Sequence, residues 1–390
     1  MSYKQNNSEI EQLTMKTKDK FSIPKFKFPL FKVYCPRGIG KKIENAMKSG
    51  EVSEGRFSQK FEKDFSKAFN LNDKKCVLVN SGTSALTLAY RILNLKENDE
   101  VISSPMTCPA TNEPLFNSDI KVKFADIDKN TGNLNLEHVK KLINKRTRAI
   151  VIVHWAGQPS DIIKLRKIIK NKNIKIIEDA AHALGAKINN KYIGHHGDFI
   201  CFSFQAIKHM TSGDGGMLVC KKISDANLAK KLRWFGISRD FIGNKWKQDI
   251  KVSGYKFHLN NLSSIIGIEQ LKTIKSKINI HKYNGLYLDK NIKNEKIKLI
   301  TRFKGSESSY WIYSILVDNK NKFRKYMNFN GIRCDEVSFR NDRYSIFKKY
   351  KVSPLPGTDF FDKHMINVPV GWWINRNQIS YIAQKINEYK

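Results

Sequence analysis

The chain has 390 residues, 41% hydrophobic and 27% charged, so it can bury a large core, and a disordered protein is not expected. Its formal net charge is +34, but the lysines are scattered and no helix-turn-helix, zinc-finger or RNP-type motif occurs, so we expect no nucleic-acid partner. No run approaches the roughly 20 apolar residues of a spanning helix, and six widely spaced cysteines are typical of a reducing compartment, so we predict a cytoplasmic protein without a membrane partner.

The first 25 residues are polar and charged without periodicity, and we expect a mobile basic arm there. Residues 35–70 have helical apolar spacing interrupted by Gly50 and Gly55, which predicts two helices around a loop. Between residues 75 and 222, short apolar runs alternate with helical segments, from CVLVN and TSALTLAYRIL to FICFSF and GMLVC. Such a pattern predicts an α/β fold with a mainly parallel sheet between helices.

From residue 262 on, a long helical stretch leads to weaker signals and a final helix, RNQISYIAQKINEY. We therefore predict an arm (1–25), a large ligand-binding α/β domain (26–262) and a smaller C-terminal α+β domain (263–390). Ligands of such folds bind beyond the carboxyl ends of the strands. The predicted strand ends are Asn80 to Ser84, Ser104 to Cys108, His154 and Trp155, Glu178 to His182, and Ser203 to Lys208.

Lys208 lies in the segment FSFQAIKHMTSGDGGM, residues 202–217. An apolar strand leads into a polar, glycine-rich loop, and a second strand follows at once. A lysine attacks carbonyl groups once it is partly deprotonated, and a pocket at a strand end can lower its pKa. The segment therefore favours Lys208 as a lysine that forms a Schiff base, and one more surface lysine is the alternative for the loop taken alone.

Two other strand ends offer complementary groups. Asp179 ends the apolar run that begins IKII, and a carboxylate there can pair with a pyridinium nitrogen, although a helix N-cap is the common alternative. In NSGTSAL, residues 80–86, a strand stops and a helix begins. Its backbone N–H groups and the hydroxyls of Thr83 and Ser84 can bind a phosphate, and helix capping explains the motif equally well.

The motifs NSGTSAL, EDAAHALGA and FSFQAIKHMTSGDGGM, in this order, resemble those of the DegT/DnrJ/EryC1/StrS family of fold-type-I aminotransferases. The resemblance extends from about Gly50 through GYKFHLNNLSSIIGIEQL to VPVGWW at residues 368–373. It implies pyridoxal 5'-phosphate as cofactor, a homodimer with shared active sites, and transfer of an amino group from glutamate to a nucleotide-linked keto sugar. The products would be 2-oxoglutarate and an amino sugar for surface polysaccharide, with a 4-keto-6-deoxyhexose as the expected substrate.

The resemblance also assigns roles to single residues. Lys208 corresponds to the Schiff-base lysine, Asp179 to the partner of the pyridinium nitrogen and Ser203 to a phosphate ligand. His182 lies where the family often has a glutamine near the cofactor ring. These assignments agree with the roles that the strand ends suggest for Lys208 and Asp179.

Three positions depart from the family pattern. Cys108 stands where an aromatic ring commonly stacks on the cofactor. Lys256 replaces an asparagine that commonly reaches across the dimer to the phosphate, and a cation would also bind that dianion. Phe339 and Arg340 lie where a histidine often approaches the substrate, and we expect Arg340 to pair with the substrate's diphosphate.

Two other functions stay open. Some members of the family use the amine form of the cofactor to dehydrate sugars, and these carry histidine in place of the lysine, so Lys208 favours amino transfer. The second alternative is a non-catalytic basic regulator or nucleic-acid-binding protein on this fold. We expect no metal site, because His195, His196 and Asp198 crowd one turn without a distant second pair of ligands.

Overall fold

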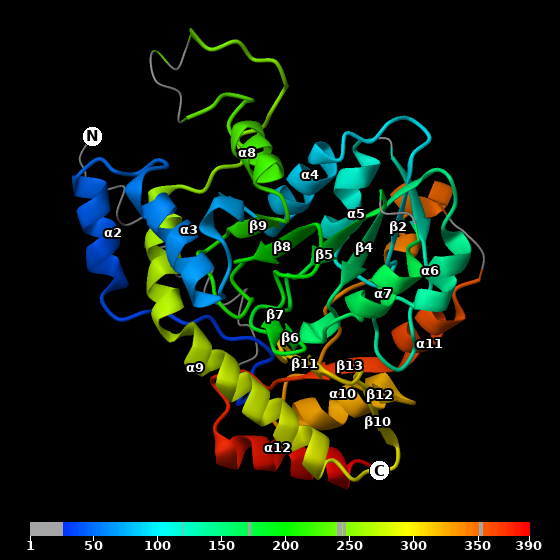
Figure 1. Ribbon diagram of the computed structural model, residues 1–390. Coiled ribbons are helices and arrows are strands. Elements are labelled where there is room, and N and C mark those ends of the chain that lie inside the picture. The colour runs from blue at the N-terminus through cyan, green and yellow to red at the C-terminus, as the bar shows by residue number, and fades with distance from the viewer. Residues whose placement is uncertain (1–25, 119, 171–172, 240–243, 245–246, 351–353) are drawn as a thin grey trace, which may run out of the picture.

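The computed structural model has a central sheet with helices on both sides and a smaller body that contains the C-terminus (Figure 1). The predicted arm, residues 1–25, lies outside the described part of the chain. The described residues are 26–118, 120–170, 173–239, 244, 247–350 and 354–390.

The central sheet contains seven strands in the order β1-β9-β8-β5-β4-β2-β3. Strand β9 is antiparallel to both of its neighbours, and the pairs from β8 to β3 are parallel. The prediction of a mainly parallel sheet in an α/β fold is therefore confirmed. The strands are β1 (Cys76–Val79), β2 (Glu100–Ser103), β3 (Lys121–Phe124), β4 (Thr147–Val153), β5 (Lys175–Asp179), β8 (Phe199–Ser203) and β9 (Gly216–Cys220).

Both faces of this sheet are covered, which explains why its strands are apolar at nearly every position. One face packs against α4 (Gly82–Ile92), α5 (Pro109–Phe116) and α8 (Ile223–Leu232). The other packs against α3 (Arg56–Ala68), α6 (Leu136–Leu142), α7 (Ile162–Ile168) and the first half of α9 (Asn261–Asn291). Along β5, Ile176 packs with the second group of helices and Ile177 with the first, as the alternation of a strand requires.

The smaller body is built on the antiparallel sheet β10-β12-β13. It is joined to the large sheet by α9, which runs between them in Figure 1. Phe28 is buried in the core of this body, and its N–H bonds the Gly331 carbonyl at 2.9 Å. The first described residues therefore pack on the small body, and the domain boundary at residue 262 stays a prediction. Its elements are β10 (Ile297–Leu299), β12 (Tyr313–Val317), β13 (Met365–Val368), α10 (Lys320–Phe329) and α12 (Arg376–Glu388).

The two helices predicted around Gly50 and Gly55 are α2 (Ile39–Lys48) and α3, and this prediction is confirmed. Gly50 has a φ of 73°, in the left-handed region that follows many helix ends. Within the described ranges, no helix is long and apolar enough to cross a membrane. The remaining elements are β6 (Lys187–Ile188), β7 (Lys191–Tyr192), β11 (Ser306–Glu307), α11 (Pro356–His364) and short 3₁₀ turns.

Candidate active site

Two neighbouring parallel strands end where the predicted site residues lie. Strand β5 ends at Asp179 and β8 ends at Ser203. Because side chains alternate along a strand, both residues face the same side as Ile177 and Cys201, which pack with α4 and α5. Glu178 faces the opposite side. The alternation therefore separates the two adjacent carboxylates.

Glu178 is fully buried and is already bonded within the fold. Its Oε2 lies 2.8 Å from His154 Nε2, and its Oε1 accepts the N–H of Gly197. His154 Nδ1 accepts the N–H of Ser160 at 3.0 Å, so the proton on Nε2 is donated to Glu178. Glu178 and His154 thus form a buried structural pair on the face away from the site.

Asp179 is also buried, with 6% of its surface exposed, but it faces α5. Its Oδ2 accepts a hydrogen bond from Thr111 Oγ1 at 2.6 Å, and its Oδ1 accepts the N–H of Ala181 at 3.1 Å. Thr111 Oγ1 lies 2.7 Å from Thr107 Oγ1. These contacts fix the orientation of the carboxylate, whose remaining lone pairs can accept from a ligand.

Lys208 follows β8 in the loop that returns to β9, and its N–H bonds the Gln205 carbonyl at 2.9 Å. Its Nζ lies 4.0 Å from the ring centroid of Trp311. Burial lowers the pKa of this amine to about 8, against the opposing effects of Asp179 and Cys108. A large fraction of the amine is therefore neutral near pH 8, which is the form that attacks a carbonyl.

The start of α4 approaches Ser203 closely and forms a small cradle. A Cβ added to Gly82 would lie 2.9 Å from Ser203 Cβ, so only glycine allows this approach. Thr83 is exposed in the first turn, whereas Ser84 is buried and its Oγ donates to Asn80 Oδ1 at 2.6 Å. The structure thus brings Thr83, Ser203 and the helix N-terminus together, while the Ser84 hydroxyl takes part in the helix cap.

His182 lies in the loop after β5 and is 7% exposed. Its ring stacks on Trp311 with centroids 3.8 Å apart and an angle of 17°. Burial, followed by the charges of Lys208 and His209, lowers its pKa well below the usual value, so the ring is neutral at neutral pH. In the described part of the chain its Nδ1 has no hydrogen-bond partner. A buried polar atom in this state is suited to a ligand.

Cys108 and Lys256 are both exposed, in different settings. Cys108 precedes α5 as its N-cap residue, one helical turn before Thr111, which bonds Asp179. Lys256 forms an isolated antiparallel β-bridge with Trp234, and its carbonyl accepts a hydrogen bond from Asn80 Nδ2 at 3.4 Å. The backbone of Lys256 therefore lies beside Asn80, the residue that follows β1, while its side chain is exposed.

Arg340 is 4% exposed and is paired with two carboxylates. Its Nε and Nη2 donate to Asp342 at 2.8 and 2.7 Å, and its Nη1 donates to Asp359. These two acids raise its pKa against the effect of burial. The next residue, Asn341, donates from Nδ2 to the Thr107 carbonyl at 2.7 Å. The segment thus reaches the cavity, but the Arg340 charge is already matched there.

Sequence reasoning missed three residues of this cluster. Thr111 lies one helical turn after Cys108, so the strand-end rule could have found it. Trp311 and Asn341 come from the C-terminal third of the chain, and no local pattern marks them. Their place in the site follows only from packing.

The residues considered for a metal site have other partners. Asp198 accepts from Arg166 at 2.5 Å and from the N–H of Ile176 at 2.8 Å. Across the ranges that the structure describes, no three His, Cys, Asp or Glu side chains are grouped to hold a metal ion.

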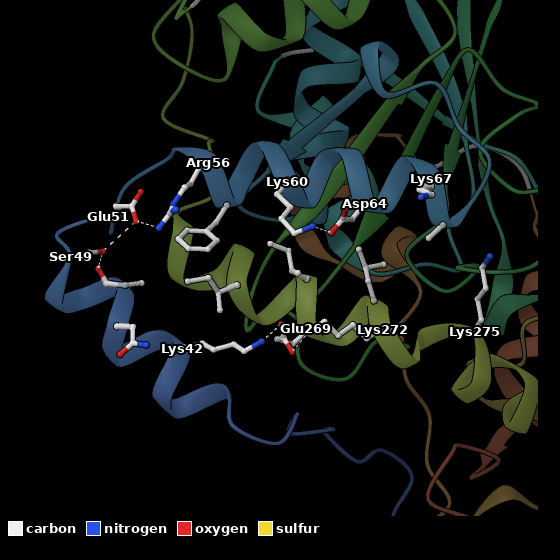
Figure 2. A pocket seen from close by; sticks show the side chains of 17 residues that line it. Lys42, Ser49, Glu51, Arg56, Lys60, Asp64, Lys67, Glu269, Lys272 and Lys275 are labelled. Carbon is white, nitrogen blue, oxygen red and sulfur yellow. Dashed lines mark hydrogen bonds and ion pairs between the residues drawn. The ribbon is translucent and has the colours of Figure 1, made fainter.

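A groove of about 990 Å³ lies away from this cluster, between α2, α3 and α9 (Figure 2). We call it the α2–α3–α9 groove. Its floor is apolar and its rim is rich in lysine. Each of its acidic side chains is bonded to a cation of the same groove, in the pairs Glu51–Arg56, Asp64–Lys60 and Glu269–Lys42. Lys208 and Asp179 do not line it.

Known proteins resemble this chain over nearly its whole length. The family model described as DegT/DnrJ/EryC1/StrS aminotransferase matches residues 37–387. GDP-perosamine synthase of Escherichia coli O157:H7 is 29% identical over 367 residues, which cover 92% of this chain and 98% of that protein. GDP-4-keto-6-deoxy-D-mannose 3-dehydratase of Escherichia coli O55:H7 is 28% identical over 322 residues, covering 76% and 82%.

The fold has solved counterparts as well. The sugar aminotransferase CalS13 from Micromonospora echinospora aligns with a TM-score of 0.87 and 28% sequence identity, over 92% of this chain and 99% of that one. Helicobacter pylori PseC, an aminotransferase involved in the biosynthesis of pseudoaminic acid, aligns with a TM-score of 0.84 and 25% identity, over 92% of this chain and 98% of that one.

Proposed function

The chain belongs to the DegT/DnrJ/EryC1/StrS aminotransferase family and is a pyridoxal phosphate-dependent aminotransferase, and from this premise we propose that it aminates a nucleotide-linked keto sugar with glutamate as donor. The observation that carries the proposal is the Lys208 amine, 4.0 Å from the Trp311 ring in the loop that follows Ser203, with a pKa lowered to about 8 by burial. The relatives GDP-perosamine synthase and CalS13 make sugars the first substrates to test, and we place a 4-keto-6-deoxyhexose in amino-sugar biosynthesis first among them.

The side chains of the cavity fit the cofactor. The N-terminus of α4 with Thr83 and Ser203 suits a phosphate dianion, and Gly82 lets the start of α4 approach Ser203 because a Cβ there would collide with the serine side chain. Asp179 suits a protonated ring nitrogen, and the stacked His182 suits a flat ring, with its Nδ1 open to a polar substituent.

When bound, pyridoxal phosphate supplies a ring that accepts electrons from the carbon that loses its proton. Lys208 would hold the cofactor, and its Nζ would accept the proton that the α-carbon of the amino donor loses in the first half-reaction and supply the proton that the sugar carbon gains in the second. Asp179 would keep the ring nitrogen protonated, and Thr111 keeps the carboxylate in place. Cys108 stands at the position where the family commonly has an aromatic ring.

The substrate and the second subunit account for the remaining predicted residues. We propose a homodimer in which Lys256 of one subunit reaches the phosphate in the other, because this side chain is exposed beside its own cradle. For Arg340 we keep the predicted role in binding the diphosphate. Asp359 is 60% exposed, so the substrate could replace it on the guanidinium while Asp342 stays bound.

A panel of nucleotide-linked 3-keto and 4-keto sugars with glutamate tests the proposal. We expect one sugar to yield an amino product together with an equal amount of 2-oxoglutarate. Replacing Arg340 with alanine should raise KM for that sugar far more than KM for glutamate, and an unchanged KM would reject the role of Arg340. Absence of any amino product across the panel would reject the sugar assignment.

The dehydratase among the relatives defines the second candidate function. Dehydration removes a hydroxyl group from the same class of sugar. The family members that catalyse it carry histidine at the position that corresponds to Lys208. Mass spectrometry of the product separates the two, because amination and loss of water change the sugar mass differently. A dehydrated product formed without consumption of glutamate would favour the second candidate.

A further inference from the structure

Trp311 is a buried aromatic ring at the centre of the Lys208 cluster, 3% exposed. It contacts the Lys208 amine at 4.0 Å and the His182 ring at 3.8 Å, both measured to its centroid. The ring of Phe31 stacks on it at 5.1 Å with an angle of 25°. One indole ring therefore touches the reactive amine, a neutral histidine and a residue from the start of the described chain.

Hydrogen bonds tie the segment that contains Trp311 to both neighbours of Lys208. Its Nε1 donates to the carbonyl of Ile207 at 2.8 Å. The ring of His209 bonds the carbonyl of Ser309, two residues before Trp311, at 3.0 Å. The neighbours of Lys208 on either side are thus bonded to one short segment. Such a two-point attachment fixes the position of the indole relative to the amine.

Phe31 lies in the segment of residues 26–36, which we call the strap, and hydrogen bonds before and after Phe31 fix this segment. Before it, the Pro29 carbonyl accepts the Nε1–H of Trp373 at 2.9 Å. After it, the Tyr34 carbonyl accepts from Gln270 Nε2 at 2.7 Å. The strap is therefore anchored to α9 and to the small body, and Phe31 lies between the two anchors, where it stacks with Trp311.

We propose that Trp311, covered by Phe31, is a positioning residue that holds the Lys208 amine and keeps water away from it. The inference rests on the proposed attachment of the cofactor at Lys208. Neither the Trp311 ring nor the Phe31 ring takes part in bond making or breaking. The positioning role connects the strap to the reaction, and the two rings form an aromatic wall at a site where Cys108 has no ring.

The expected effect follows from what surrounds the amine. The titratable groups near it are Asp179, Cys108, His182 and His209. Burial lowers the Lys208 pKa to about 8 and outweighs Asp179 and Cys108, which raise it. Removing the indole admits water, which solvates the ammonium form better than an aromatic face does. The amine should then titrate at higher pH and react more slowly at neutral pH.

The test is timed labelling of the full-length apoprotein with pyridoxal phosphate from pH 6 to 10. Borohydride quenches the reaction, and mass spectrometry of the Lys208 peptide gives the rate. Trp311→Ala and Phe31→Ala should move the rise of the profile upwards by roughly 0.5 to 1 pH unit and slow labelling at pH 7.5 about three- to tenfold. Trp311→Phe, which keeps a ring, should restore most of the wild-type profile.

Phe361→Ala is the matched control, because Phe361 lies in the same hydrophobic cluster but packs edge-on against Trp155, with centroids 5.5 Å apart. It should lower stability without moving the profile. If Trp311→Ala does not fold, the half-buried Phe31 still decides the question. Unshifted profiles in both alanine variants, or an equal shift in Phe361→Ala, would overturn this inference alone. An unlabelled Lys208 in the wild-type protein would overturn the proposed attachment together with it.

Discussion

The Lys208 cavity and the α2–α3–α9 groove both present lysine amines, yet the two environments act on them in opposite directions. In the groove, the hydrogen bond that Lys272 donates to Glu269 raises the pKa of Lys272 above its ordinary value. In the cavity, burial lowers the pKa of Lys208 to about 8 although Asp179 and Cys108 oppose the change. The comparison shows that a high lysine content does not make a reactive amine. A lysine amine becomes reactive when burial lowers its pKa and no close ion pair raises it again.

Replacing Lys208 with alanine should have the largest effect on this contrast. Amino transfer should fall about 10³-fold or more, because the residue both attaches the cofactor and moves the proton. The measurement is kcat with the best sugar of the panel, alongside cofactor retained after dialysis. Replacing Lys272 with alanine is the control and should leave both unchanged. An active Lys208→Ala enzyme would exclude this lysine as the catalytic base.

The two adjacent carboxylates offer the next test. Asp179→Asn should lower kcat about 10²- to 10³-fold with little change in melting temperature, because the amide cannot balance a charged ring nitrogen. Glu178→Gln should instead reduce the free energy of unfolding by about 1–3 kcal/mol, because the buried pair with His154 loses its charge. Reversed effects would show that the strand presents the other carboxylate to the site.

The titration of the two lysines sharpens the comparison further. A neutral amine reacts and its ammonium form does not, so the acetylation rate rises with pH and levels off above the pKa. The acetylation rate of Lys208 should rise about tenfold per pH unit below pH 8 and then level off. The acetylation rate of Lys272, whose pKa is raised, should still be rising at pH 10. Competitive labelling with acetic anhydride and mass spectrometry of both peptides measures this, and coincident profiles would contradict it.

The smallest effect is expected at the rim of the groove. Lys67 and Lys275 are exposed there, so replacing both with alanine removes little packing. We expect kcat/KM within about twofold of wild type and a change in the free energy of unfolding within about 0.5 kcal/mol. A tenfold loss of kcat/KM with intact folding would mean that the groove takes part in the reaction.

Much of this arrangement was readable from local sequence pattern. The apolar runs predicted all seven strands of the central sheet, and the strand-end rule pointed to Asp179, Ser203 and Lys208. The pairing of Arg340 with Asp342 and Asp359 was not predicted, although Asp342 is only two residues away. A charge in sequence does not reveal whether its partner is a neighbouring side chain or a substrate.

The sequence by itself determined the order of strands and helices and the residue types that end each strand, because these depend on periodicity over a few residues. The tertiary structure alone decided that Trp311, distant from Lys208 along the chain, contacts its amine and stacks with Phe31. It also directed Glu178 into a buried pair and Asp179 into the cavity. Burial arises from contacts between distant segments, so the reactivity of Lys208 depends on the folded chain as a whole.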